Sequence, residues 1–278
     1  MDDRFVVLTE YFRSDHSGRR KEIVKSIEVN ARIPQTKQVV LFMDPEVEFP
    51  IELKRALSKE NFNKIEVHYL LPGDRSVYAD FFSYSNEHLS GELCLLCNND
   101  MSFDETLDEI KAVEDFDLGQ HFLSLTRWDL RLNNTLRFKQ PARIRKNSQD
   151  AWIFKSPLPA KMVEKGGFYM GRPGCDGMIS YLATISGLKV LNPSETIKAK
   201  HFHLSRHRTY SRRHRMGGDD IYMCVYPTDE VKFDPKKLMY RFGNPVENAY
   251  GQEAIDIAIE REEENQIHWD YALEKCMR

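Results

Sequence analysis

The amide and carboxylate side chains that follow the apolar run 93–97 are the first candidates for chemistry. Asn98, Asn99 and Asp100 come directly after a segment that is typical of a buried strand, with no glycine to form a turn. Open α/β sheets bind their ligands at the carboxyl ends of the strands. Taken alone, an Asp at such an end is more often a helix cap or turn former, but oxygen side chains there can also hold a hard divalent cation.

Two further carboxylates, Asp150 and Asp176, are candidates for proton transfer. Asp150 precedes the aromatic and aliphatic run 151–154, where it either opens a short helix as its N-cap or acts as a catalytic base. Asp176 lies between two glycines, which predicts a tight turn ahead of a helix over 178–186. Gly187 then ends that helix, as a glycine just past a helix C-terminus should.

Histidines and arginines are concentrated later in the chain. His201 and His203 are two apart in a predicted strand, so their side chains share one face. Zinc would need more partners than these, so we expect one metal or phosphate contact and one structural histidine. The arginines of 205–215, which include Arg206 and Arg208, either form a solvated face or bind phosphates.

Alternating strands and helices in the first hundred residues must position these side chains. Apolar runs predict four strands, at 5–9, 38–44, 64–71 and 92–97. Helical periodicity predicts three helices between them, at 19–30, 51–61 and 77–89. This alternation predicts a largely parallel sheet with helices on both faces.

The pattern loosens beyond residue 100. A short helix is predicted over 102–113 and a strand with an aromatic end over 121–130. Residues 217–278 then contain a strand-like run and a helix from about residue 252 to residue 264. We therefore expect one domain over 1–216 and a C-terminal extension over 217–278 that packs on it.

The composition is that of a soluble globular protein. With 41% hydrophobic residues, 30% charged residues and a net charge of −3, neither a nucleic-acid partner nor a membrane surface is predicted. The chain starts on charged residues and lacks an apolar run of about 20 residues, so we expect a cytoplasmic protein without a membrane span. Cys94 and Cys97 are expected in the core rather than in a redox or zinc site.

Several motifs occur in an order that resembles a known family. Arg75 with "SVYADFFSYSN" is followed by "CNNDMSFDETL", "LTRWDL", "SQDAWIF", "GCDGMISYL" and "LNPSETIKAKHFHLSRHRTY". This series, over residues 5–215, resembles the small GT-A glycosyltransferase domains of large algal viruses and some bacteria. The resemblance implies an α/β, GT-A (Rossmann-like) fold with a mixed, mainly parallel sheet flanked by helices. The C-terminal 60 or so residues are not covered by it.

The resemblance also implies roles for the strand-end residues. In that family an Asn-Ser-Asp or Asp-x-Asp motif holds Mn²⁺ or Mg²⁺ against the diphosphate of a nucleotide-sugar. Asp100 is the implied metal ligand, and Asn98 takes the position often held by a first Asp, with Asn99 beside it. His203 is expected as a second metal ligand and, together with Arg206 or Arg208, to stabilise the developing charge from the opposite side.

The nucleotide is expected at the ends of the first strands. Its base and ribose would be surrounded by Thr9, Tyr11, Arg20 and Asp44, and Arg75 would approach the base or the phosphates. Ordinary loop packing is the alternative for Thr9 and Tyr11. Trp128 is either a core aromatic or a platform for a sugar.

These expectations combine into a metal-dependent glycosyltransferase that moves a sugar from a nucleotide-sugar donor, with UDP as the expected nucleotide, to a glycan hydroxyl acceptor. An inverting mechanism is favoured, with Asp150 as base and Asp176 binding the acceptor. One alternative is a non-catalytic carbohydrate- or polyanion-binding protein that uses the arginine run. The other is a sugar-1-phosphate nucleotidyltransferase, although the segment after the first strand has a single glycine where such enzymes carry a glycine-rich loop. The oligomeric state is not predicted.

Overall fold

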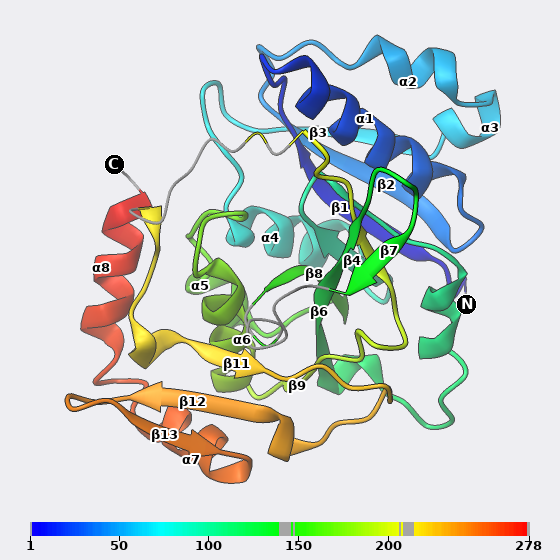
Figure 1. Cartoon of the computed structure of the whole chain (residues 1–278). Coiled ribbons are helices and arrows are strands. Elements are labelled where there is room, and N and C mark those ends of the chain that lie inside the picture. Colours follow the sequence, from blue (N-terminus) through cyan, green and yellow to red (C-terminus); the bar gives the residue numbers. More distant parts are fainter. Residues whose placement is uncertain (1, 139–145, 147, 206, 208–213, 277–278) are drawn as a thin grey trace.

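The computed structural model describes residues 2–138, 146, 148–205, 207 and 214–276. Within them, ten strands form one sheet in the order β3-β2-β1-β4-β8-β6-β10-β5, with β7 and β9 paired to β6 (Figure 1). The strands are β1 (Phe5–Tyr11), β2 (Thr36–Met43), β3 (Ile65–Tyr69), β4 (Leu93–Cys97), β5 (Met101–Ser102), β6 (His121–Leu130), β7 (Leu136–Phe138), β8 (Gln149–Lys155), β9 (Lys189–Leu191) and β10 (Ala199–His201).

The sheet is parallel in its first half and mixed beyond it. Strand β1 pairs in parallel with both β2 and β4, and β2 pairs in parallel with β3. Strand β8 then lies antiparallel between β4 and β6, and β6 pairs in parallel with β9 and β10. The expected fold class, a mixed and mainly parallel α/β sheet flanked by helices, is confirmed.

Helices cover both faces of the sheet because side chains alternate along each strand. Val6 and Leu8 of β1 belong to the core under the face with α4 and α6, whereas Phe5 and Val7 pack with α1. The helices are α1 (Ser17–Arg32), α2 (Ile51–Ala56), α3 (Lys59–Phe62), α4 (Tyr78–His88), α5 (Ala160–Glu164), α6 (Cys175–Ile185), α7 (Gln252–Glu260) and α8 (Gln266–Cys276).

Two predicted helices differ from the observed ones. The helix expected over 51–61 is broken into α2 and α3, because the Ser58 side chain accepts a hydrogen bond from the Asn61 N–H and so starts a new helix. The helix expected over 102–113 is a 3₁₀ helix, η1 (Glu105–Ile110), which the Asp104 side chain caps.

The C-terminal region forms a three-stranded antiparallel sheet with helices α7 and α8. Its strands are β11 (Met223–Val225), β12 (Leu238–Phe242) and β13 (Glu247–Tyr250), and short 3₁₀ helices lie at Asp219–Ile221 and Pro235–Lys237. The predicted last helix ends at Glu260 instead of residue 264. Trp269 of α8 packs edge-on against Phe168 with ring centroids 5.6 Å apart, so this region shares one core with α4 and α6.

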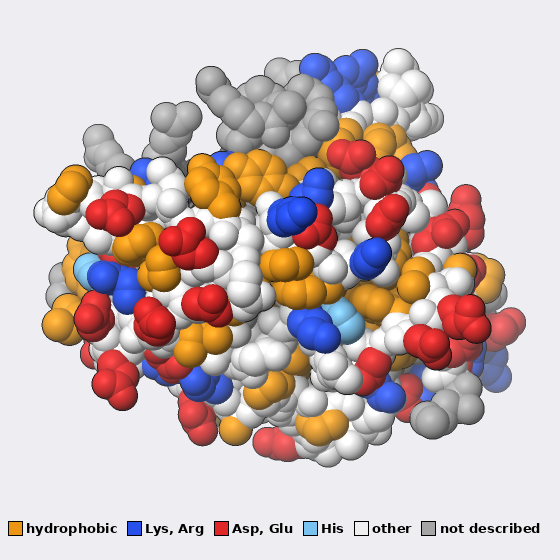
Figure 2. Space-filling model, turned by 90° about the horizontal axis from the view of Figure 1, so that it is seen from below, with side chains coloured by type: hydrophobic (Ala, Val, Ile, Leu, Met, Phe, Trp, Pro, Cys, Tyr) orange, Lys and Arg blue, Asp and Glu red, His pale blue; other side chains and the backbone are white. Residues whose placement is uncertain are grey.

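The surface view of the lower face shows charges of both signs. Lys and Arg side chains are interspersed with Asp and Glu, and hydrophobic side chains occur in small groups among them (Figure 2). Among the described residues drawn there we find no broad basic patch, so this face gives no support to polyanion binding. In the described parts of the chain, every helix is too short or too polar to cross a bilayer.

Candidate functional site

Asp100 is the centre of a buried ionic cluster at the end of β4. It lies in the loop between β4 and β5 and is 4% exposed. Its Oδ2 lies 2.6 Å from Arg19 Nη1, 3.0 Å from His201 Nε2 and 3.6 Å from His203 Nδ1. Burial by itself raises the pKa of Asp100. The charge of His201 and the hydrogen bonds from His201 and His203 outweigh burial, so the pKa of Asp100 lies well below its usual value.

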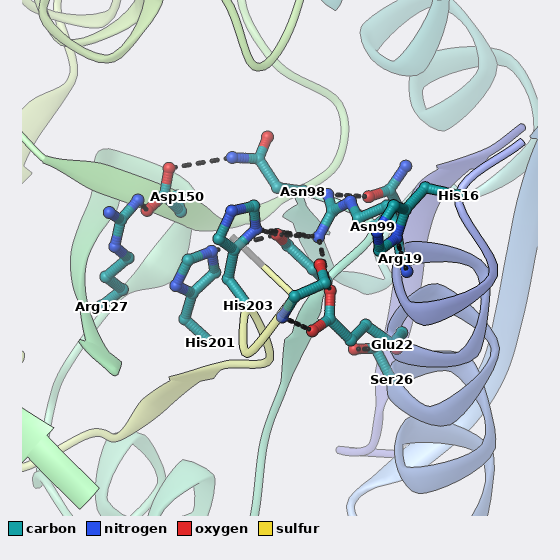
Figure 3. Close-up of polar contacts among 12 residues, drawn as sticks. His16, Arg19, Glu22, Ser26, Asn98, Asn99, Arg127, Asp150, His201 and His203 are labelled. Carbon is teal, nitrogen blue, oxygen red and sulfur yellow. Dashed lines mark hydrogen bonds and ion pairs between the residues drawn. The ribbon is translucent and has the colours of Figure 1, made fainter. Parts of the chain in front are cut away.

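His201 and His203 come to Asp100 from the same side. Strand β10 ends at His201, whereas the sequence prediction placed His203 in the same strand. The two rings nevertheless stack, with centroids 5.3 Å apart and an interplanar angle of 5°. Both rings face the Asp100 loop, and Arg19 approaches from helix α1 (Figure 3). Burial has the largest single effect on the pKa of His201 and lowers it, but the charge and hydrogen bond of Asp100 and the hydrogen bond to Asp129 together outweigh it, so the net shift is upward.

This cluster fits a divalent cation. One atom each from Asp100, His201 and His203 lies within 4.8 Å of the others. A carboxylate with two imidazoles suits an ion such as Mn²⁺ better than Mg²⁺, which takes oxygen ligands. The second ring nitrogen of His203, Nε2, is buried and has no hydrogen-bond partner among the described residues. The other ring nitrogen, Nδ1, faces Asp100 and Arg19.

Behind His201, a chain of charges leads to β8. His201 Nδ1 lies 3.0 Å from Asp129 Oδ1, and Arg127 Nε donates to the same oxygen at 3.1 Å. Arg127 Nη1 in turn donates to Asp150 Oδ2 at 2.6 Å. Such a carboxylate behind a histidine fixes its ring orientation and tautomer, so Asp129 keeps Nε2 of His201 directed at Asp100.

Arg127 stays charged although it is buried. Burial lowers its pKa, but the neighbouring carboxylates of Asp150 and Asp129 raise it above the ordinary value for arginine. Residues 127 and 129 are two apart in β6, so they share a face of the strand. The sequence analysis did not select Arg127 or Asp129, although the spacing Arg-x-Asp in a predicted strand was a usable signal.

Asp150 is a strand residue and not a helix cap. It lies in β8, and that alternative from the sequence is therefore wrong. Its Oδ1 accepts a hydrogen bond from Asn98 Nδ2 at 2.9 Å and its Oδ2 accepts from Arg127. Because β8 runs beside β4, the backbone N–H of Asn98 also donates to the Asp150 carbonyl, at 3.0 Å. Asn98 thus joins the Asp100 loop to β8 (Figure 3).

Asp176 lies in the first turn of α6 rather than in a turn ahead of it. Gly174, at a φ of 97°, forms the N-cap, a left-handed conformation that favours glycine. The carboxylate accepts hydrogen bonds from the Gly177 N–H at 3.1 Å and from the Tyr222 hydroxyl at 3.3 Å. Burial, with the Asp150 charge as a second cause, raises the pKa of Asp176 to about 7.

Tyr222 from the C-terminal region closes over this turn of α6. A Cβ atom on residue 177 would lie 2.2 Å from the Tyr222 ring, so the contact requires glycine at that position. The ring therefore approaches the backbone of α6 beside Asp176, and the hydrogen bond from its hydroxyl lowers the pKa of Asp176, against the effect of burial. No signal in the sequence connected Tyr222 with Asp176.

Arg19, the neighbour of the predicted Arg20, is the arginine that reaches the cluster. Helix α1 begins at Ser17, and the His16 side chain caps it by accepting the Arg19 N–H at 3.1 Å. From there the Arg19 guanidinium donates through Nη2 to Asn99 Oδ1 at 3.1 Å. Arg20 also lies in this first turn.

The residues predicted to surround the nucleotide have different partners. The Thr9 hydroxyl donates to the Cys97 carbonyl at 3.0 Å, and Tyr11 is buried in the core with α1. Asp44 accepts the backbone N–H groups of Glu46 and Gly73 at 2.8 and 3.0 Å, and thereby shapes the loop after β2.

Arg75 keeps an accessible guanidinium near the end of β1. It pairs with Glu10 at 3.6 Å, its side chain is 45% exposed, and it lies over the Tyr169 ring at 5.5 Å. Burial raises the pKa of Glu10, while Arg75 and the Ser76 N–H act against the shift. Glu10 was not selected from the sequence. Arg206 and Arg208 lie outside the described residues.

The remaining candidates have partners within the fold. Trp128 stacks on Phe138 with ring centroids 4.7 Å apart, and its indole N–H donates to the Ser194 carbonyl at 2.7 Å. Cys94 and Cys97 are buried free thiols, and burial raises the pKa of Cys94 to about 12. Their interpretation as core residues is confirmed.

Comparisons with known proteins give similar folds at low identity. No family model matches the chain, and no curated protein matches it significantly. One similar solved structure is the mannosyltransferase PcManGT from Pyrobaculum calidifontis in complex with GDP-Man and Mn²⁺, at 15% identity and a TM-score of 0.45, over 72% of this chain and 56% of that one. The S. aureus protein TarS, residues 1–349 with UDP-GlcNAc, matches at 15% identity and a TM-score of 0.45, over 75% and 60% of the two chains.

A third similar structure is 4-diphosphocytidyl-2C-methyl-D-erythritol synthase from Anaerococcus prevotii. It matches at 15% identity and a TM-score of 0.39, over 69% of this chain and 87% of that one. Of the P. calidifontis mannosyltransferase, the aligned region covers little more than half, 56%. At these identities and TM-scores the likenesses carry no argument about activity.

Proposed function

We propose that this protein is a metal-dependent glycosyltransferase that moves a sugar from a nucleoside-diphosphate sugar, with UDP as the expected nucleotide, to a glycan hydroxyl. The observation that carries the proposal is the adjacency of a candidate cation site and two carboxylates at one end of the sheet. The Asn98–Asp150 hydrogen bond joins the loop of Asp100 to β8, and the Asp150 charge acts on Asp176. A transfer reaction needs both parts side by side.

The cation would be held by Asp100, His201 and His203, with Asp129 fixing His201 from behind. Its positive charge would stabilise the negative charge that builds on the departing diphosphate. The carboxyl edge of the parallel strands is where such a ligand is expected in an open α/β sheet. A transition-metal ion such as Mn²⁺ suits this donor set better than Mg²⁺.

We assign the general base to Asp176 and a positioning role to Asp150, the reverse of the assignment expected from the sequence. Both oxygens of Asp150 are engaged by Asn98 and Arg127, which suits a residue that positions its neighbours. Asp176 has a pKa of about 7, close to the value at which a carboxylate is an efficient base near neutral pH. A base of this kind would deprotonate the acceptor hydroxyl in a single displacement, which inverts the anomeric centre.

Hydrolysis of nucleotide-sugars tests the proposal. Purified protein is incubated with a panel of UDP- and GDP-sugars and Mn²⁺, and release of the nucleoside diphosphate is measured for wild type and Asp100→Asn. Glu87→Gln is the matched control, because its carboxylate on α4 is 69% exposed. We expect slow hydrolysis of one donor, stopped by chelation and lost in Asp100→Asn but not in Glu87→Gln.

Other outcomes would point elsewhere. If no donor is bound or turned over, the transferase proposal fails, and salt-sensitive binding of a polyanion would favour a non-catalytic binding protein. If the protein instead releases pyrophosphate from a nucleoside triphosphate and a sugar 1-phosphate, a nucleotidyltransferase is favoured.

A further inference from the structure

The Arg19 guanidinium lies among the atoms that would hold the cation. Its Nη1 is 2.6 Å from Asp100 Oδ2 and 3.2 Å from His203 Nδ1. Asp100 and His203 are, together with His201, the residues whose side chains form the candidate metal site. A positively charged nitrogen and a divalent cation cannot both lie within contact distance of the same oxygen and imidazole nitrogen.

We infer that Arg19 and the divalent cation are alternative occupants of this site, and that the cation displaces Arg19 toward the donor diphosphate. This inference rests on the proposed function. In the absence of the ion, Arg19 compensates the buried Asp100 carboxylate together with the two histidines beside it. Once released, its planar guanidinium suits two phosphate oxygens, because it donates in a bidentate manner.

The surroundings of Arg19 allow this exchange. The residue stands in the first turn of α1, and its side chain is 13% exposed, so the guanidinium is at the rim of the cluster. Glu22 lies 3.7 Å from Nη1 and offers a second carboxylate to the displaced arginine. Glu22 is itself fixed, because its Oε2 accepts the Ser205 hydroxyl at 2.7 Å.

The geometry gives Arg19 two opposite effects. It competes with the cation for Asp100 and His203, so it weakens metal binding. It also supplies positive charge for the diphosphate, so it strengthens donor binding when the metal is present. A residue with a purely structural role would weaken both, because its loss would disorder the cluster.

The first experiment is a Mn²⁺ titration of the protein without nucleotide, by isothermal calorimetry or by electron paramagnetic resonance of free Mn²⁺. Arg19→Ala and Arg19→Gln remove the charge, Arg19→Lys keeps it, and Lys21→Ala is the control on an exposed position of the same helix. We expect about tenfold tighter Mn²⁺ binding for the Ala and Gln variants, since one charge-assisted hydrogen bond no longer has to be broken. The Lys and control variants should bind close to wild type.

The second experiment is a titration with UDP at saturating Mn²⁺. The Ala and Gln variants should bind UDP about tenfold more weakly than wild type, which is the order expected for loss of one charged contact to a phosphate. Circular dichroism of every variant checks that it is folded. Using two neutral replacements keeps the test decisive if one of them fails to fold.

Weaker or unchanged Mn²⁺ binding in the neutral variants would overturn the exchange. So would a wild-type protein that binds UDP without any metal and loses that binding with Arg19, since the arginine would then be the permanent cation. The metal titration needs no donor, so the exchange can be supported even where no nucleotide-sugar is turned over. That pattern would reject the transferase proposal alone.

Discussion

Two buried polar networks of this molecule differ in their charge. The sheet-edge network runs from Arg19 through Asp100, His201, Asp129 and Arg127 to Asp150, and all its members carry ionisable groups. The tyrosine network joins α6 to the C-terminal region through neutral groups. In it, the Asn265 amide donates to the Asp220 carbonyl at 2.8 Å and lies 2.9 and 2.8 Å from the hydroxyls of Tyr181 and Tyr240.

This difference in charge distinguishes a network that can bind a ligand from one that holds two regions of the protein together. Neutral hydrogen bonds satisfy buried groups without the desolvation cost of charges, so the tyrosine network can hold two regions together in one conformation. A buried ionic chain contributes little net stability, because desolvation offsets much of its attraction. Its retention at the carboxyl edge of the sheet is therefore better explained by what the charges can bind.

The largest expected effect is a loss of turnover at the candidate site that leaves the tyrosine network intact. Asp176→Asn should lower turnover of the best donor and acceptor by about 10²–10⁴-fold, the contribution of a positioned base. In wild type the rate should rise with pH up to about 7, because the carboxyl group must lose its proton first. The pH–rate profile of both proteins measures this, and a variant that keeps the rising limb would show that Asp176 is not the base.

The next effect is a loss of stability in the tyrosine network that leaves the candidate metal site intact. Asn265→Ala leaves the hydroxyls of Tyr181 and Tyr240 without their shared partner, so the free energy of unfolding should fall by about 2–3 kcal/mol. Urea denaturation measures it, with Gln266→Ala as the exposed neighbouring control. Mn²⁺ affinity at a temperature where both proteins are folded should match wild type. A lowered affinity would mean that the two networks are not separate.

A third effect concerns the cost of the raised pKa. The pKa of Asp176 is about 7 in the folded protein, compared with the ordinary value of 3.8 that applies to the unfolded chain. The folded state therefore binds the proton more tightly. This contribution to stability is full below about pH 4 and is lost as the pH rises through 7. Compared with Asp176→Asn, metal-free wild type should therefore lose about 2 kcal/mol between pH 4 and 7.5, a value reduced for partial exposure. Urea denaturation at both pH values measures these free energies of unfolding. An equal change between the two pH values for wild type and Asp176→Asn would contradict the raised pKa.

The smallest effect sharpens the role of the residue behind the histidine. Asp129→Asn should weaken Mn²⁺ binding about tenfold, because the amide holds the His201 ring less firmly than the carboxylate. Calorimetry measures the affinity, with Asp256→Asn on the exposed side of α7 as control. Equal affinity for all three proteins would remove Asp129 from the metal site.

Local sequence patterns were sufficient for the parallel half of the sheet. The runs that became β1, β2 and β4 are apolar and bounded by polar residues, so the end of β4 and the position of Asp100 could be predicted. The spacing of His201 and His203 predicted that their side chains lie on one side, and in the structure the two rings stack. The capping hydroxyl of Ser58, by contrast, broke a helix that periodicity alone made continuous.

The rest of the site depends on contacts between distant segments. Selecting Arg19 over Arg20 requires the starting residue of α1, because a shift of one residue turns a side chain by about 100°. The pairing of Arg127 with Asp150 requires β8 to lie antiparallel between β4 and β6, and no pattern in the chain encodes that strand order. The raised pKa of Asp176 depends on burial that only the folded molecule has.

The close approach of Tyr222 to Gly177 bears on how freely parts of this protein could be exchanged in evolution or in the laboratory. The proton affinity of Asp176 is set partly by a ring that belongs to residues 217–278. A chain cut after residue 216, or a chimera with a foreign C-terminal segment, would remove the hydrogen bond by which the Tyr222 hydroxyl lowers that pKa. The C-terminal region would then act as a tuning element of the reaction, and its loss would shift the pH optimum even where the remaining fold survives.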